Sequence, residues 1–80
     1  MMKIKVKLFG TLGQKFPGYD YKKGLEMELP EGARIGDLLA RLELSDGNKP
    51  VVAVDGLIRR PQDELSQGAV VHVLQAVYGG

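Results

Sequence analysis

The chain has 80 residues, which suits one domain with one modest hydrophobic core. Its 11 basic and 10 acidic side chains nearly cancel, and no aromatic residues interleave with the bases, so a nucleic-acid-binding surface is not expected. With no cysteine and one histidine, the sequence supplies no disulfide framework, no cysteine nucleophile and no metal site of its own. It shows no apolar segment of signal-peptide or membrane-spanning length, which predicts a cytoplasmic protein without membrane contact.

The first predicted strand spans residues 3–8, where basic and apolar side chains alternate. A period of two is typical of a strand with one buried face. Lys3, Lys5 and Lys7 then form a row on the other face. That row fits either a solvated surface or a docking surface for an acidic partner.

A second strand is predicted over residues 25–29, which alternate in the same way and are closed by Pro30. It can pair antiparallel with the first strand, with Glu26 and Glu28 on the outer face near the lysines. Cross-strand charge pairs of this kind contribute about 0.2–1 kcal/mol each.

A long connection, residues 10–24, joins these two strands and is rich in glycine. Its glycines are irregularly spaced and do not lie between a strand and a clear helix, so a phosphate-binding loop is not predicted. A short helical turn over residues 12–16 is compatible with the i, i+4 spacing of Leu12 and Phe16.

The main helix is predicted from an apolar stripe with i, i+3, i+4 and i+7 spacing, made by Ile35, Leu38, Leu39 and Leu42. Asp37 in its first turn and Arg41 in its last both lie where the helix dipole favours their charge. Arg34 is a poor N-cap residue, and Gly36 is unfavourable inside a helix, so Gly36 is expected near the helix start.

Three further strands complete the pattern. Residues 51–54 form a short apolar strand, Asp55-Gly56 is a hairpin turn signal, and residues 57–58 continue as a short strand. The last strand is predicted over residues 69–74. A hairpin followed by one helix and more strands predicts an α+β fold, with one mixed sheet packed on one main helix.

The chain ends on two glycines directly after the last strand. Glycine lacks a Cβ and adopts conformations closed to other residues, so Gly79 and Gly80 would form a thin arm able to enter a narrow slot. If the valines of the last strand point inward, His72 and Leu74 must point outward, because side chains alternate along a strand.

Four stretches together resemble the MoaD/ThiS family of ubiquitin-like sulfur-carrier proteins. These stretches are residues 5–10 (Lys-Val-Lys-Leu-Phe-Gly), 30–39, 52–56 (Val-Ala-Val-Asp-Gly) and the terminal Gly79-Gly80. The family contains the small subunit of molybdopterin synthase and the thiamine sulfur carrier. The resemblance covers nearly the whole chain and implies a β-grasp (ubiquitin-like) fold, a single sulfur-carrier domain over residues 1–80, and a flexible tail over residues 76–80.

The resemblance also implies chemistry at the C-terminus. An adenylating enzyme of the ubiquitin-activating type uses ATP to attach AMP to Gly80, and a sulfur donor then forms a thiocarboxylate. The chain would be a cosubstrate rather than a catalyst by itself, and it would bind no cofactor. Implied partners are the adenylating enzyme, the sulfur donor, and either the large subunit of molybdopterin synthase or thiazole synthase.

Residue roles carry over from the family in the same way. Gly80 would bear the adenylate and then the sulfur, and Gly79 would keep the arm slim. The remaining candidates would contact a partner, either from the tail or from the outer face of the sheet: Ala76, Val77 and Tyr78, and Phe9, Leu57, His72 and Leu74. Phe9 is compatible with a core position as well.

The resemblance is compatible with two biosynthetic pathways. The tail, with Ala76-Val77 before the diglycine, is similar to the thiamine carrier, although Tyr78 stands where that carrier usually has glycine. The length and the long connection after Gly10 are similar to the molybdopterin subunit, and molybdopterin or tungsten-pterin biosynthesis is therefore the preferred prediction. A protein modifier joined to lysines through Gly80 and a β-grasp binding module without tail chemistry are the alternatives from other classes.

Overall fold

The computed structural model describes residues 1–44 and 50–75. They form a five-stranded sheet, one α-helix and one short 3₁₀ helix. In chain order the elements are β1 (Met2–Leu8), the 3₁₀ helix (Gly10–Lys15), β2 (Leu25–Leu29), α1 (Ile35–Arg41), β3 (Pro50–Val54), β4 (Leu57–Arg59) and β5 (Val70–Gln75). The predicted order of elements is confirmed, and each predicted strand is within two residues of its observed bounds.

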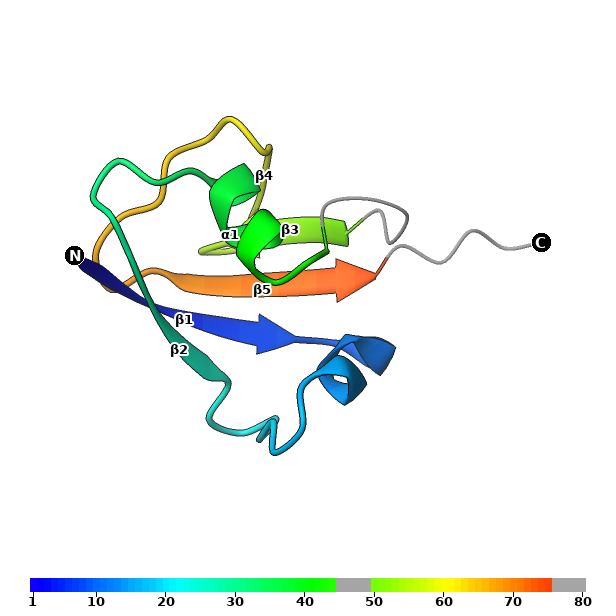
Figure 1. The fold of residues 1–80 in the computed structure, drawn as a ribbon. Helices are drawn as coiled ribbons and strands as arrows, with labels where there is room; N and C mark the ends of the chain where they lie inside the picture. Colours follow the sequence, from blue (N-terminus) through cyan, green and yellow to red (C-terminus); the bar gives the residue numbers. More distant parts are fainter. Residues whose placement is uncertain (45–49, 76–80) are drawn as a thin grey trace.

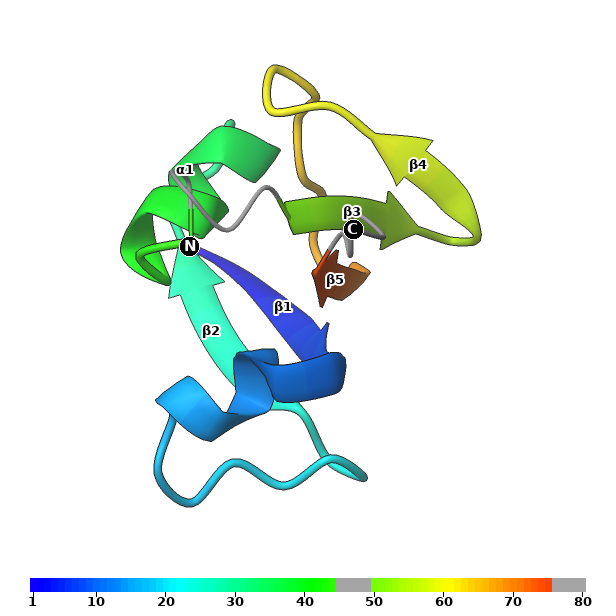
Figure 2. The same cartoon turned by 90° about the vertical axis from the view of Figure 1, so that its right-hand side faces the viewer.

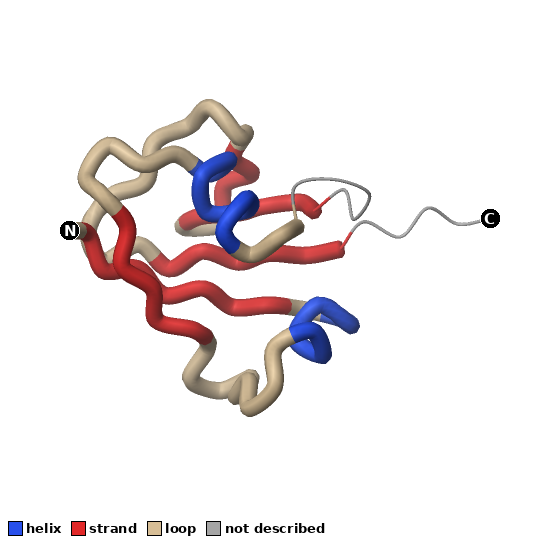
Figure 3. The backbone as a smooth tube through the Cα atoms, viewed as in Figure 1, coloured by secondary structure: helices blue, strands red, loops and turns tan. Residues whose placement is uncertain are grey.

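The sheet is mixed, with the strand order β2-β1-β5-β3-β4. The first and last strands, β1 and β5, run parallel at its centre, and the other neighbouring pairs are antiparallel (Figures 1 and 3). The last strand therefore has hydrogen-bonded neighbours on both sides. This arrangement confirms the predicted α+β fold with one mixed sheet packed on one helix.

The register assigns side chains to the two faces of the sheet. Val6 of β1 is level with Leu25 of β2 and with Val71 of β5, so all three point to the same side. On the opposite side, Lys5 is level with Glu26, as the sequence predicted for the hairpin. We call the side that packs on α1 the covered face and the opposite side the open face.

The helix α1 lies in the concave side of the curved sheet (Figure 2). Its start is stabilised by groups outside the apolar stripe. The Asp37 carboxylate accepts a hydrogen bond from the Arg34 backbone N–H at 2.9 Å, and the Gly36 N–H donates to the Pro61 carbonyl at 2.8 Å. A Cβ at Gly36 would lie 3.2 Å from that carbonyl oxygen. The close approach of the loop explains why glycine occupies this position.

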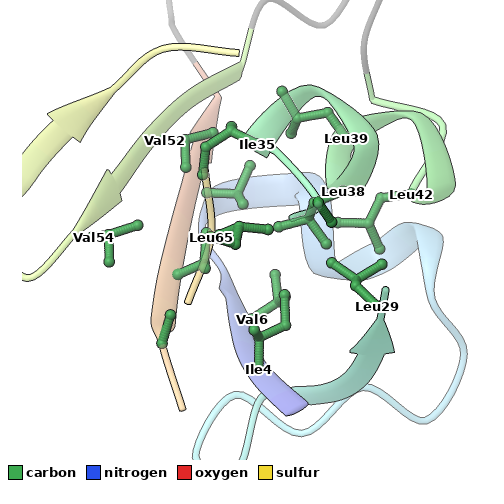
Figure 4. Close-up of a cluster of buried hydrophobic side chains, with 14 of the residues drawn as sticks. Ile4, Val6, Leu29, Ile35, Leu38, Leu39, Leu42, Val52, Val54 and Leu65 are labelled. Carbon is green, nitrogen blue, oxygen red and sulfur yellow. The ribbon is translucent and has the colours of Figure 1, made fainter. Parts of the chain in front are cut away.

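The core lies between α1 and the covered face (Figure 4). All four predicted helix-stripe residues are buried there. The buried cluster draws on every element of the fold except β4: Met2, Ile4, Val6 and Leu8 from β1, Leu12 from the 3₁₀ helix, Leu29 from β2, Ile35, Leu38 and Leu39 from α1, Val52 and Val54 from β3, and Val71 and Val73 from β5, joined by Ala33, Leu42, Leu44, Leu65 and Ala69 from the loops.

Candidate functional site

The last described strand, β5, ends at Gln75, and five residues follow it in the sequence. The predicted tail residues Ala76, Val77, Tyr78, Gly79 and Gly80 thus lie outside the described residues, and their roles stay predictions. What the structure does define is the surface from which the tail departs. This surface is the end of the sheet where β1 and β5 both terminate (Figure 1).

An apolar patch covers the open face at this end. It consists of Phe9, Val51, Ala53, Ile58, His72 and Leu74. The register carries it across three strands, because Val51 is level with Leu74, and Ala53 is level with both His72 and Ile58. The side chains of Phe9 and Leu74 are 42% and 40% exposed, and that of Ile58 is 75% exposed. An exposed apolar surface of this kind is typical of a protein-binding site.

Phe9 and His72 contact each other within this patch. Their rings meet edge to face, with centroids 5.6 Å apart. The Phe9 backbone N–H donates to the Val73 carbonyl at 3.0 Å, which continues the β1–β5 pairing one residue beyond β1. Phe9 is therefore an open-face residue and not a core residue. The outward direction predicted for His72 and Leu74 is confirmed, because the alternating Val71 and Val73 are 0% exposed on the covered face and Leu74 is 40% exposed.

The predicted position of Leu57 is wrong. Leu57 is level with Val54, a core residue, so its side chain points to the covered side of the sheet even though it is 60% exposed at the edge. Ile58 takes its place on the open face. The Asp55-Gly56 turn predicts this arrangement. In a two-residue hairpin turn the flanking residues, here Val54 and Leu57, pair and lie on the same face. Both turn residues have positive φ values, as such a turn requires.

Two tyrosines, which sequence reasoning left without a role, hold Phe9 in position. The pairing of β1 with β2 ends at Val6, so Leu8 has no residue of β2 opposite it. The Leu8 backbone N–H donates instead to the Tyr19 hydroxyl at 2.7 Å. The Tyr21 hydroxyl donates to the Gly10 carbonyl at 3.4 Å, and the two rings meet edge to face with centroids 4.8 Å apart. Leu8 and Gly10, which flank Phe9, are thus each hydrogen-bonded to a tyrosine of the long connection.

Glycine is required beneath the tyrosine pair. A Cβ at Gly13 would lie 2.8 Å from the Tyr21 hydroxyl oxygen and 2.9 Å from Cδ2 of Tyr19. The 3₁₀ helix can approach the two rings only because residue 13 has no side chain. Gly13 thus serves packing, whereas Gly10 and Gly18 have positive φ values and open space around a Cβ.

The remaining half of the open face is charged. Lys3 is level with Glu28 and Lys5 with Glu26, while Lys7 is level with His72 at the border of the apolar patch. Among the described residues, no group of three or more His, Cys, Asp or Glu side chains could hold a metal ion. No helix in residues 1–44 or 50–75 is long and apolar enough to cross a membrane. The open face thus combines a charged half, over β1 and β2, with an apolar half, over β5, β3 and β4.

Comparison with known proteins gives matches over almost the whole length. The sequence model described as the ThiS family matches residues 6–80. Among solved structures, a protein from Pyrococcus furiosus provisionally designated molybdopterin converting factor, subunit 1, is 30% identical with a TM-score of 0.73, over 96% of this chain and 100% of that chain. None of the curated proteins compared with the chain matched it.

Two more distant structures share the fold. The small archaeal modifier protein 1 of H. volcanii is 16% identical, with a TM-score of 0.76, over 96% of this chain and 100% of that one. Subunit 1 of the Helicobacter pylori molybdopterin-converting factor, solved in complex with subunit 2, is 21% identical, with a TM-score of 0.60. That match covers 99% of this chain and 100% of the other. Both belong to the β-grasp architecture observed here.

Proposed function

This chain belongs to the ThiS family and has the role of a sulfur carrier in cofactor biosynthesis, and on that premise we propose that the sulfur is carried on the Gly80 carboxylate. A carboxylate is a poor acyl electrophile because its negative charge and resonance oppose nucleophilic attack. In the proposed first step, an oxygen of Gly80 attacks the α-phosphorus of ATP, and pyrophosphate leaves. The product is an acyl-adenylate, a mixed anhydride in which both obstacles are removed.

In the second step sulfide, delivered by the sulfur donor as HS⁻, attacks the activated carbonyl carbon of Gly80. The new carbon–sulfur bond replaces the carbon–oxygen bond to AMP, which leaves as an anion, and loss of the sulfur's proton gives a terminal thiocarboxylate. The adenylating enzyme binds ATP and supplies the catalytic groups, while the carrier supplies the terminus. Gly79 gives that terminus a backbone without side-chain bulk.

One observation carries this proposal: the family match extends through Gly80 and so includes the diglycine end. The described structure supports it in two ways. The strand that leads to the tail is held by β1 on one side and β3 on the other, which gives the arm a fixed origin. The apolar patch beside that origin offers a surface on which an activating enzyme can dock.

The receiving pathway is proposed to be molybdopterin or tungsten-pterin biosynthesis, with a large synthase subunit as a second partner. The 30% identity to the Pyrococcus furiosus protein and the complex of subunits 1 and 2 from Helicobacter pylori support this choice. Transfer to a thiazole synthase in thiamine biosynthesis is the alternative, and the name of the matching family and the Ala76-Val77 sequence support that one.

The decisive experiment is the intact mass of the full chain after incubation with ATP, a sulfur source and an extract of its own host. We expect a mass increase of about 16 Da, the difference between sulfur and oxygen, located in the C-terminal peptide. A chain lacking Gly80 should keep the cooperative unfolding of the parent and acquire no mass. An intact chain that stays unmodified under these conditions would contradict the proposal.

The same samples test the conjugation alternative. A protein modifier would give a ladder of higher-mass species that disappears when Gly79 and Gly80 are deleted. The similarity to small archaeal modifier protein 1 concerns the fold and does not favour conjugation, because the identity is 16%.

A further inference from the structure

The three lysines on the open face have different neighbours. Lys3 and Lys5 each lie opposite a glutamate of β2. Lys7 lies beyond the start of β2, and the residue on that side is Gly24, where a Cβ would be 3.3 Å from Cγ of Lys7. Gly24 offers no side chain to the ammonium group. The register therefore pairs two of the three lysines with carboxylates and leaves Lys7 opposite a glycine.

On the C-terminal side of Gly24 the first acidic residue is Glu26, which is level with Lys5, and on the N-terminal side it is Asp20, whose carboxylate has backbone partners. The Asp20 carboxylate accepts hydrogen bonds from the backbone N–H groups of Lys22 and Lys23, at 2.8 and 3.4 Å. On its other side Lys7 is level with His72, which offers no negative charge. Lys7 is also half-buried, so its stem lies against the sheet while its charge stands at the border of the apolar patch.

The reach of the tail determines which surface a partner must cover. Five residues follow Gln75, and an extended chain spans at most about 3.6 Å per residue, or about 18 Å in all. A partner that receives Gly80 in a slot must therefore contact the end of the sheet where β5 terminates. The open face presents exposed apolar side chains at that end, namely Phe9 and Leu74.

We propose that Lys7 determines partner specificity: the adenylating enzyme, which covers the apolar patch, carries a carboxylate that faces the Lys7 ammonium. This inference rests on the proposed function, because it assigns the docking surface of the same carrier. Docking removes water from Lys7, and a desolvated cation without an opposite charge is costly. A partner carboxylate offsets the desolvation free energy of Lys7 and fixes the orientation of the complex. An apolar partner surface without a carboxylate binds more weakly.

The test compares Lys7→Gln with the matched control Lys3→Gln, using the adenylating enzyme of the same host and the full-length carrier. Both substitutions remove one positive charge from the same strand and the same face. We expect Lys7→Gln to raise the KM for the carrier in ATP–pyrophosphate exchange about 10-fold, with kcat unchanged, and to flatten the dependence of KM on salt. Lys3→Gln should change KM less than about 2-fold. Lys7→Arg, which keeps the charge, should restore KM to within about 3-fold of the parent.

The outcomes separate this inference from the proposed function. If the parent chain supports no pyrophosphate exchange, the proposed function fails. If the parent is active and the two Gln variants have equal KM values, only the role of Lys7 fails. Dimerisation of the carrier alone in analytical ultracentrifugation, abolished by Ile58→Ser, would assign the patch to a second copy and overturn the proposal. Urea unfolding of each variant ensures that a KM change does not reflect loss of the fold.

Discussion

Consecutive residues of β5 face entirely different surroundings. Val71 and Val73 point to α1 and are 0% exposed, whereas His72 and Leu74 point to the open face, where Leu74 is 40% exposed. Both sets belong to one strand, which pairs with β1 on one side and with β3 on the other. The difference lies only in what covers the side chains, since α1 covers one face and leaves the other open.

This contrast separates the residues that stabilise the domain from those that recognise a partner. Apolar area on the covered face is removed from water on folding, which contributes about 25 cal/mol per Å². Apolar area on the open face stays partly hydrated in the free carrier and contributes mainly when a partner covers it. A substitution on one face should therefore change the free energy of unfolding, and one on the other face should change affinity.

The largest effect on stability is expected for Val73→Ala, with Leu74→Ala as its neighbour on the opposite face. Val73→Ala removes two methyl groups from a fully buried position, which should lower the free energy of unfolding by about 2 kcal/mol. Leu74→Ala should lower it by less than about 0.5 kcal/mol, yet weaken binding to the adenylating enzyme about 10-fold. Urea denaturation and isothermal calorimetry measure the two quantities. Equal stability losses for the two variants would show that the faces are not separated as described.

A smaller effect on the unfolding free energy is expected for Tyr19→Phe. This substitution tests the end of β1, where Leu8 points to the covered face and Phe9 to the open face. The substitution removes the hydroxyl that accepts the Leu8 N–H and leaves the ring in place. We expect a loss of about 1 kcal/mol in unfolding free energy, because a part-buried amide loses its partner. Tyr21→Phe is the matched control, since its contact to the Gly10 carbonyl is longer, at 3.4 Å, and exposed. Amide hydrogen exchange of Leu8 should accelerate in the Tyr19 variant alone.

The smallest effect on stability is expected at β4, for Ile58→Ser and Leu57→Ser. Both side chains are more than half exposed, so each substitution should change the unfolding free energy by less than about 0.5 kcal/mol. Their effects on partner binding should differ, because only Ile58 shares the open face with His72 and Leu74. We expect Ile58→Ser to weaken binding several-fold and Leu57→Ser to leave it nearly unchanged. The opposite order would restore Leu57 as the docking residue.

Much of the fold follows from local patterns. The alternation in residues 3–8 and 25–29 and the four-residue helix stripe predict β1, β2 and α1, because a strand and a helix bury one face with different periods. The outward direction of His72 and Leu74 follows from the same alternation. For the candidate site, these patterns predict which strands contribute to the patch, but they do not assign every residue to its face.

The residues that were missed depend on contacts between distant segments. Tyr19 completes the hydrogen bonding of β1 from 11 positions away, and no periodic pattern marks it. Gly24 lies against Lys7 only because the connection returns to the hairpin at that point. The open-face position of Ile58, by contrast, follows from the two-residue turn, because that turn fixes the register of β3 and β4.

The sequence by itself determined the order of elements, the faces of β1, β2 and β5, and the family to which the diglycine end belongs, because each is written in residue type and spacing. The tertiary structure decided which side chains share one surface. The parallel pairing of β1 with β5 brings Lys7 and Phe9 beside His72, and antiparallel pairing with β3 and β4 adds Ile58. Strand order and register are properties of the whole packed sheet, and a surface that spans four strands exists only once they are set.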